Sequence, residues 1–277
     1  MWPALDLGKD SYVRHDLRNA RILITGGGNG IGRLLALKSA DRGAHVIVWD
    51  LSAEAGGKVA EEIRAKGGTC DAYTVDVTNR EDVALAAEKV GDLDVLVNNA
   101  GIVTGKPLLE ASESEIDRTF DVNTKSLYWT TRAFLGGMIE RRKGMIVTVA
   151  SAAGMVGVAK QTDYSASKFA AFGFTESLRA ELQKSGSGVD TLVVCPFYID
   201  TGMFDGVKTK FPLLLPILHE DDVAEKMLKA IEAGKKQLIM PPFVRYLPAA
   251  RLLPAPAFDK LMNFLGVNNT MDEFHGR

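Results

Sequence analysis

A tyrosine, a lysine and a serine have the spacing that proton-transfer chemistry requires. Tyr164 and Lys168 are four residues apart in a stretch of helical periodicity, so their side chains lie on one face of the predicted helix. The lysine ammonium stabilises a tyrosinate and lowers the pKa of the phenol from its reference value of about 10. Ser151 ends a predicted strand earlier in the chain, and its hydroxyl can hold and polarise the same substrate oxygen. Such a group can exchange a proton with an alcohol or carbonyl oxygen while a hydride moves to or from a nicotinamide.

A glycine-rich loop predicts where the nicotinamide cofactor binds. Residues 26–32, of sequence GGGNGIG, directly follow the first predicted strand, and a helix begins at once. Without side chains, the backbone N–H groups and the helix N-terminus can approach a pyrophosphate. The alternative, a glycine-rich turn without a ligand, does not account for the acidic residue that ends the next strand at the expected distance.

Two aspartates end the second and third predicted strands. A carboxylate at Asp50 can accept hydrogen bonds from the adenosine ribose hydroxyls and repels a 2′-phosphate, so the sequence favours NAD over NADP. No basic residue adjoins Asp50 in the segment that follows it, although Arg33 could lean toward the site. Asp76 could contact the adenine edge or cap the next helix, and the two roles are compatible.

Hydrophobic periodicity predicts the frame that positions these residues. Short aliphatic runs alternate with longer stretches of helical period, which indicates βαβ units. The predicted strands cover 21–25, 45–49, 69–75, 93–98, 145–149, 190–194 and 237–240, and the predicted helices cover 31–42, 54–66, 81–90, 114–141, 164–184 and 220–233. We therefore expect an α/β protein with a Rossmann-like, doubly wound sheet of about seven parallel strands and helices on both faces.

The chain divides into a single domain with two extensions. We expect an N-terminal arm at 1–20, a dinucleotide-binding and catalytic domain at 21–240, and a C-terminal extension at 241–277. Prolines and charges break the apolar stretch at 238–267, so a membrane-spanning helix is not expected there. Its aromatic and aliphatic content predicts that the extension is a substrate lid, a subunit contact or a lipid-surface contact.

Composition excludes several classes of protein. The 277 residues are 46% hydrophobic and 25% charged, as in soluble globular proteins, and the net charge of -2 argues against a nucleic-acid partner. Two cysteines and four scattered histidines predict neither a disulfide framework nor a metal site. The first twenty residues have no apolar core of signal-peptide length, and we expect a cytoplasmic protein.

In its motifs the chain resembles the short-chain dehydrogenases/reductases of the non-extended type. The matching pieces, in the family's order and spacing, are TG-x3-G-x-G at 25–32, NNAG at 98–101, DVNT at 121–124, Ser151 and YSASK at 164–168. The resemblance implies that Tyr164 is the general acid/base and that Lys168 lowers its pKa and binds the nicotinamide ribose. It also implies that Ser151 orients the substrate and that Asn123 holds a proton-relay water.

The same resemblance, together with the two aspartates, implies a set of cofactor-binding residues from several loops. These are Gly26, Asn29, Gly30, Ile31, Asp50, Leu51, Asp76, Val77, Asn98, Ala100, Gly101, Tyr164, Lys168, Pro196, Ile199 and Thr201. Thr201 stands where the family's threonine meets the nicotinamide carboxamide. Phe197 departs from the family, which has glycine there, and adds bulk near the nicotinamide.

The run CPFYIDTGMF at 195–204 resembles the branch that contains retinol dehydrogenase 10 and 17β-hydroxysteroid dehydrogenase 11. The resemblance implies an NAD-dependent short-chain alcohol dehydrogenase or carbonyl reductase with a retinol-like or hydroxysteroid-like substrate. Animal members of this branch tend to carry an apolar N-terminal anchor, and from residues 1–20 we do not expect one here. Apolar residues in the segments that flank substrate in this fold also favour a lipophilic substrate: Met155, Val156, Val158, Met203, Phe204, Val207, Phe211, Leu213, Leu214 and Leu215.

Two further expectations complete the interpretation. In this family the long helices that carry Asn123 and Tyr164 usually pair between subunits, which implies a homodimer or homotetramer. The alternative function is a non-catalytic dinucleotide-sensing or scaffold protein on the same fold. We would expect such a protein to lack at least one of Ser151, Tyr164 and Lys168, and all three are present.

Overall fold

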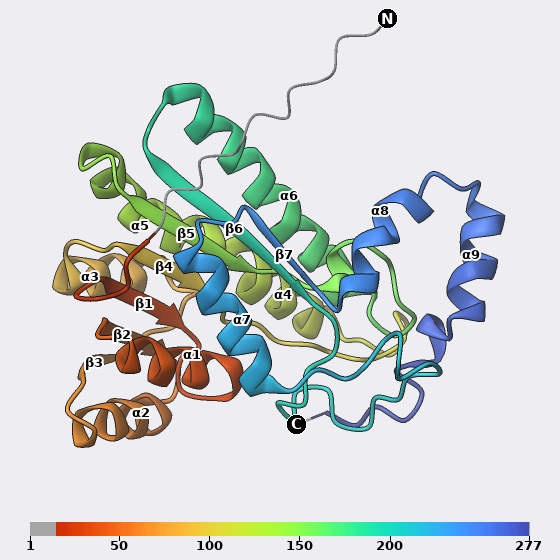
Figure 1. Ribbon diagram of the computed structural model, residues 1–277. Coiled ribbons are helices and arrows are strands. Elements are labelled where there is room, and N and C mark those ends of the chain that lie inside the picture. The colour runs from red at the N-terminus through yellow and green to blue at the C-terminus, as the bar shows by residue number, and fades with distance from the viewer. Residues whose placement is uncertain (1–14, 277) are drawn as a thin grey trace, which may run out of the picture.

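The computed structural model describes residues 15–276 and contains one parallel sheet between two layers of helices (Figure 1). Its strand order is β3-β2-β1-β4-β5-β6-β7. The strands are β1 (Arg21–Thr25), β2 (His45–Asp50), β3 (Thr69–Thr74), β4 (Val95–Asn98), β5 (Gly144–Val149), β6 (Val189–Pro196) and β7 (Gln237–Met240). The chain reverses direction across the sheet between β1 and β4, and the crevice at that point is where such sheets bind ligands. The predicted fold class is confirmed.

Side chains of each inner strand alternate between the two faces of the sheet. Ile22 and Ile24 of β1 pack toward α1 (Gly30–Asp41), α2 (Ala53–Ala65) and α7 (Glu220–Glu232). Leu23, between them, packs on the opposite face, toward α3 (Arg80–Val90), α5 (Ser126–Glu140) and α6 (Thr162–Ser185). Because both faces are covered, nearly every residue of the inner strands is apolar and buried.

The single helix predicted over 114–141 is wrong. The structure has α4 (Glu113–Phe120), then a π-helical turn at Asp121–Lys125, and then α5. The widened turn is held from outside, because the Asn123 side chain accepts from the Ile102 backbone N–H at 2.8 Å and donates to the Ile102 carbonyl at 2.9 Å. Helical periodicity continues through such a turn, so the sequence pattern does not mark it.

The C-terminal extension contains helical elements that the sequence analysis did not predict. After a 3-10 turn, α8 (Leu247–Ala250) and α9 (Ala255–Phe264) project beside the sheet, and the chain then returns to the segment that follows β6 (Figure 1). Val244, Met262 and Leu265 bury their side chains in a third apolar cluster. No helix among the described residues is long and apolar enough to cross a membrane.

The predicted N-terminal arm falls mostly on residues 1–14, which lie outside the described residues. Residues 15–20 pack on the domain: Leu17 is buried, and the His15 Nε2 atom lies 3.1 Å from a carboxylate oxygen of Asp190. This last part of the arm is therefore fastened to the start of β6.

Candidate active site

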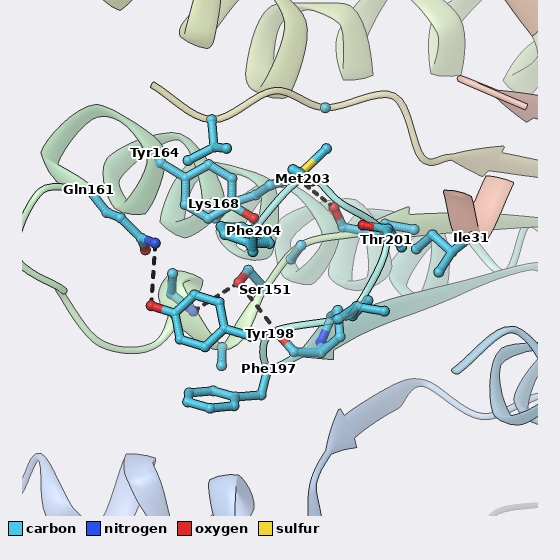
Figure 2. A pocket seen from close by; sticks show the side chains of 18 of the residues that line it. Ile31, Ser151, Gln161, Tyr164, Lys168, Phe197, Tyr198, Thr201, Met203 and Phe204 are labelled. Carbon is cyan, nitrogen blue, oxygen red and sulfur yellow. Dashed lines mark hydrogen bonds between the residues drawn. The ribbon is translucent and has the colours of Figure 1, made fainter. Parts of the chain in front are cut away.

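A cavity of about 430 Å³ lies at the carboxyl ends of the strands. One part of its wall comes from the glycine loop, the end of β2 and the loop after β4, and includes Gly26, Asn29, Gly30, Ile31, Gly32, Asp50, Asn99, Ala100 and Gly101. The other part comes from the segment after β6 and the C-terminal extension, and includes Phe197, Tyr198, Met203, Phe204, Leu215, Phe243, Val267 and Phe274. Tyr164, Lys168 and Ser151 line the same cavity, and Figure 2 shows them with Phe204 and Tyr198 of the second part.

The glycine loop leaves its backbone open to the cavity. Gly26 and Gly30 have φ of +61° and +51°, in the region that favours glycine. A Cβ atom on Gly32 would lie 2.1 Å from the Gly26 carbonyl oxygen, so no side chain fits there. Within residues 15–276, the Asn29 side chain makes no capping bond to α1. The loop and the helix N-terminus therefore offer backbone N–H groups to an anion, which fits a dinucleotide pyrophosphate.

Asp50 lies against this loop from the end of β2. Its Oδ2 atom accepts from the Gly28 N–H at 2.8 Å, and its Oδ1 atom accepts from the Ser52 N–H at 2.9 Å. Each carboxylate oxygen can accept a second hydrogen bond, so both stay able to bind ribose hydroxyls. Arg33 does not line the cavity, because its guanidinium pairs with Glu62 of α2 at 2.5 Å.

The three proton-transfer residues come from two elements. Tyr164 and Lys168 project from α6, and Ser151 follows β5. The Lys168 ammonium donates to the Val149 carbonyl at 2.9 Å and lies 5.7 Å from the centre of the Tyr164 ring. The Ser151 hydroxyl accepts from the Ala153 N–H at 3.1 Å. The two elements thus bring the phenol, the ammonium and the hydroxyl to one point of the cavity.

Burial sets the protonation of this group. It raises the pKa of the Tyr164 phenol above its ordinary value, against the expectation that Lys168 lowers it, and a hydrogen bond with Ser151 opposes that rise. Burial also lowers the pKa of Lys168 to about 8. At neutral pH the phenol is therefore protonated and the lysine is mostly charged. This is the state in which tyrosine can act as an acid and lysine can favour the tyrosinate that follows.

Asn123 lies behind this group rather than in the cavity wall. Its Nδ2 atom donates to the Ser167 hydroxyl at 3.0 Å. A Cβ atom built on Gly101 would lie 3.3 Å from both the Asn123 Oδ1 atom and the Lys168 Nζ atom, so the two side chains meet at that glycine. The π-helical turn places Asn123 next to the lysine, and such turns are frequent at functional sites.

The structure brings most of the predicted cofactor residues to the cavity wall. The exceptions are Leu51, Asp76, Val77 and Asn98. The Asn98 side chain is buried and bonds the Thr130 and Thr131 hydroxyls of α5, whereas its neighbour Asn99 lines the cavity. The Leu51 side chain is 61% exposed.

Asp76 shapes the turn after β3. One of its carboxylate oxygens accepts from the Thr78 N–H at 2.9 Å and from the Thr78 hydroxyl at 2.7 Å. The residue that caps α3 is Asn79, whose side chain accepts from the Glu81 and Asp82 N–H groups. The expectation that Asp76 caps this helix is therefore wrong.

Sequence reasoning missed the cavity residues that the C-terminal extension contributes. Phe243, Val267 and Phe274 line the cavity although they are 46 or more positions after Phe197 in the chain. It also missed Gln161 and Tyr198, whose side chains are buried in the wall. Only the high apolar content of the extension signalled burial, and composition does not specify which surface it covers.

A glycine cradle beside a tyrosine, lysine and serine defines a class of enzyme, the nicotinamide-dinucleotide-dependent oxidoreductases that transfer hydride. The chain belongs to the short-chain dehydrogenase/reductase family, because the family model for short chain dehydrogenases matches residues 20–211. It is similar to epidermal retinol dehydrogenase 2 of Mus musculus, with 41% identity over 274 residues that cover 96% of this chain and 89% of the relative.

Solved structures agree with this assignment. A Burkholderia phymatum short-chain dehydrogenase/reductase in complex with NAD is 27% identical, with a TM-score of 0.76 and coverage of 86% of this chain and 94% of its own. A metagenomic short-chain oxidoreductase in complex with NADP is 28% identical, with a TM-score of 0.69 and coverage of 82% and 98%. Relatives named as retinol dehydrogenases and as a 17-beta-hydroxysteroid dehydrogenase confirm the predicted branch. The protein is a short-chain alcohol dehydrogenase that uses a nicotinamide dinucleotide, and the non-catalytic alternative is not supported.

Proposed function

We propose that this enzyme interconverts a lipophilic alcohol and its ketone or aldehyde, with NAD(H) as the preferred hydride carrier. The observation that carries the proposal is that Tyr164, Lys168 and Ser151 line one cavity together with the glycine loop and an apolar wall. The residues that exchange the proton are therefore adjacent to an apolar space that can hold the substrate. A charged substrate would lose its hydration in that space without gaining a partner.

Each residue of the group has a separate task. The Tyr164 phenol gives its proton to the substrate oxygen during carbonyl reduction and takes it back during alcohol oxidation. The bound nicotinamide supplies or accepts the hydride. The contact in which the Ser151 hydroxyl donates to the Pro196 carbonyl is long, at 3.5 Å, so the hydroxyl can turn and donate to the substrate oxygen instead. The Lys168 ammonium stabilises the tyrosinate, and Asn123 behind it supports the supply of protons.

The preference for NAD rests on the charges near the adenosine ribose. The Asp50 carboxylate is fixed at the glycine loop by two backbone hydrogen bonds and repels a 2′-phosphate. The basic candidate that the sequence offered, Arg33, is paired with Glu62 and does not line the cavity. A 2′-phosphate would therefore meet a negative charge without a compensating cation.

The apolar wall supports a lipophilic substrate of the retinol-like or hydroxysteroid-like kind. Val156, Val158, Met203, Phe204 and Leu215 line the cavity as the sequence analysis expected of substrate-flanking residues. The other members of that predicted set do not line it, and Leu213 is fully exposed. The similarity to a protein named as a retinol dehydrogenase supports the same substrate class.

A panel of alcohols tests the proposed function. Purified protein is incubated with NAD or NADP and with short aliphatic, aryl secondary, long-chain, retinol and hydroxysteroid alcohols, and the absorbance of the reduced cofactor is followed. We expect turnover with NAD on the lipophilic members and little on the short ones. Tight NADH binding without turnover on any member would contradict the proposal and revive a sensing role.

We also propose that the extension and the loop at 210–213, which contacts it through Lys210 and Phe264, contact a lipid surface. Leu252 is 87% exposed, Leu213 is fully exposed, and Phe264 is 63% exposed with the Lys210 ammonium 5.4 Å from its ring centre. Exposed apolar side chains beside a cation suit a membrane with anionic lipids. Flotation with anionic vesicles should recover the wild type more fully than a variant with Leu252→Ser and Phe264→Ser, and equal recovery would contradict the contact.

Assembly into a homodimer or homotetramer and cytoplasmic localisation stay predictions. The outer faces of α5 and α6 expose Tyr128, Ile139 and Phe169 to the extent of 46%, 40% and 36%. Apolar side chains on adjacent helices support a subunit contact at this face.

A further inference from the structure

The last described residues, Thr270–Gly276, lie across the substrate part of the cavity, and we call them the strap. Hydrogen bonds fasten the strap to the loop before α6 and to the segment after β6. They run from the Lys160 Nζ atom to the carbonyls of Met271 and Asp272 (both 3.3 Å), and from the N–H groups of His275 and Gly276 to the Asp205 carbonyl (3.1 and 3.3 Å). The strap therefore joins two segments that both form the cavity wall.

A directed chain of hydrogen bonds links the strap to Tyr198. The Thr270 hydroxyl donates its proton to the Val267 carbonyl at 2.8 Å, so it accepts from the Tyr198 hydroxyl, also at 2.8 Å. The Gln161 amide then donates to the Tyr198 oxygen at 3.4 Å and to the Met271 sulfur at 3.0 Å (Figure 2). The Tyr198 hydroxyl is thus turned toward the strap and is not free for the reacting oxygen.

Aromatic contacts connect the strap with the catalytic tyrosine. The Phe204 ring meets the Tyr164 ring edge-on with centres 5.8 Å apart, and it meets Tyr198 in the same way at 5.1 Å. Its third aromatic neighbour is Phe274 of the strap, at 6.4 Å. Phe204 and Phe274 both line the cavity, so they share the wall beside the catalytic phenol.

Two glycines make room for the strap. A Cβ atom on Gly105, in the loop after β4, would lie 2.0 Å from the Phe274 ring. A Cβ atom on Gly206, after β6, would lie 2.0 Å from the Glu273 carbonyl oxygen. Real Cβ atoms do not approach other atoms so closely, so any other residue at either position would displace the strap.

From these contacts we infer that Phe274 is a specificity-determining residue: the strap holds its ring in the cavity wall and thereby limits the bulk of the alcohol that reaches Tyr164. This inference rests on the proposed function, since it concerns which lipophilic alcohols are accepted. Within the lipophilic class of the proposed function, the ring lowers kcat/KM for polycyclic alcohols relative to slim unbranched ones. Removal or displacement of the ring should relax this preference by about 10-fold, because pocket contacts of this size discriminate to that extent.

The test compares Phe274→Ala, Gly105→Ala and Gly91→Ala. The last is a matched control, because Gly91 has nearly the same φ as Gly105 (+68° against +71°) but nothing within 4 Å of its Cβ position. For each protein, kcat/KM is measured with NAD for an unbranched long-chain alcohol and for a polycyclic secondary alcohol. We expect the polycyclic-to-unbranched ratio to rise in the Phe274 and Gly105 variants and to stay at the wild-type value in the Gly91 variant. An unchanged ratio in Phe274→Ala would overturn the inference.

A second measurement separates this inference from the proposed function. The dye anilinonaphthalene sulfonate is titrated into the NADH-loaded wild type and the same variants, and its fluorescence is followed. This measurement requires no turnover. Stronger dye binding in Phe274→Ala than in Gly91→Ala supports the ring as a wall of the cavity. If the wild type oxidises none of the alcohols but this difference is present, the proposed function fails and the assignment of Phe274 stands. Equal dye binding contradicts the assignment.

Discussion

The two parts of the cavity are built in different ways. The cofactor part is made largely of the glycine loop at 26–32, of the loop after β4 at 99–101 and of Asp50, whose carboxylate is fixed by backbone N–H groups. The substrate part is made of side chains from distant segments, such as Phe204 after β6, Phe243 after β7 and Phe274 of the strap. A local turn fixes the first part, whereas only the packing of the whole chain fixes the second.

Because of this difference, the two parts should respond differently to substitutions. A wall of backbone tolerates no added atom, and a few fixed hydrogen bonds hold its shape, such as that of the Gly28 N–H to Asp50. A wall of aromatic side chains can be reshaped by single substitutions that leave the fold intact. One added atom should therefore weaken cofactor binding strongly, whereas substitutions in the aromatic wall should change substrate preference gradually.

Tyr164→Phe gives the largest expected effect, because it removes the only atom that exchanges the proton. Turnover of the best alcohol should fall by about 1,000-fold, within the range for lost general acid/base catalysis. The dissociation constant of NADH, measured by fluorescence titration, should stay near the wild-type value, since the backbone wall is untouched. A variant that keeps most of its turnover would show that another group transfers the proton.

Lys168→Met measures how much burial of the lysine ammonium in the cavity lowers the free energy of unfolding. Below pH 8 the lysine is charged in the folded and in the unfolded protein, and burial of this charge destabilises the folded protein. Between about pH 8 and pH 10.5, the folded lysine loses its proton while the unfolded one keeps it, so its contribution to the free energy of unfolding rises with pH.

We therefore expect the variant's stability relative to the wild type to be greater at pH 7.5 than at pH 10.5, by about 3 kcal/mol. Urea unfolding of the cofactor-free proteins at the two pH values gives this difference. A pH-independent difference would mean that water reaches the ammonium and that the substrate part is open.

Gly32→Ala tests the claim that the cofactor part tolerates no added atom. The new Cβ atom would lie 2.1 Å from the Gly26 carbonyl oxygen, and relief of such an overlap costs about 2 kcal/mol. NADH binding by isothermal titration calorimetry should weaken by roughly 30-fold. Gly57→Ala is the matched control, because nothing lies within 4 Å of its Cβ position. Equal binding by both variants would show that the loop yields as easily as the aromatic wall.

The sequence predicted the elements whose signals are local. Alternating side chains such as Ile22, Leu23 and Ile24 are all apolar because the strand is covered on both faces, and that pattern identifies a buried parallel strand from one chain. The break between α4 and α5 was not predictable, because the contact of Asn123 with Ile102 that holds it joins residues from different elements. Helical periodicity is the same on both sides of such a break.

The same distinction between local and long-range signals applies to the residues of the site. Four-residue spacing on a helix brings Tyr164 and Lys168 together whatever the rest of the fold does. Nothing near Phe274 in the sequence indicates that its ring will lie against Gly105, because that contact depends on how a long extension returns to the domain. Asn98 illustrates a smaller failure: the motif marks the right loop, but the alternation of side chains turns Asn98 into the core and leaves Asn99 at the cavity.

The smallest expected effect comes from a change of charge at the adenosine ribose. It separates the contribution of the charge to cofactor choice from the contribution of the backbone shape. Asp50→Asn keeps an oxygen that can accept from the Gly28 N–H, so the loop should hold, but it removes the negative charge. We expect the ratio of kcat/KM for NADP to that for NAD to rise by about 10-fold. Asp50→Ala should lose NAD binding as well, because it also leaves the Gly28 N–H without its acceptor. Glu62→Gln, added to Asp50→Asn, frees Arg33 from its partner and should raise the ratio further. If Asp50→Asn leaves the ratio unchanged, the carboxylate acts only by shaping the loop, and the cofactor part selects its ligand by backbone alone.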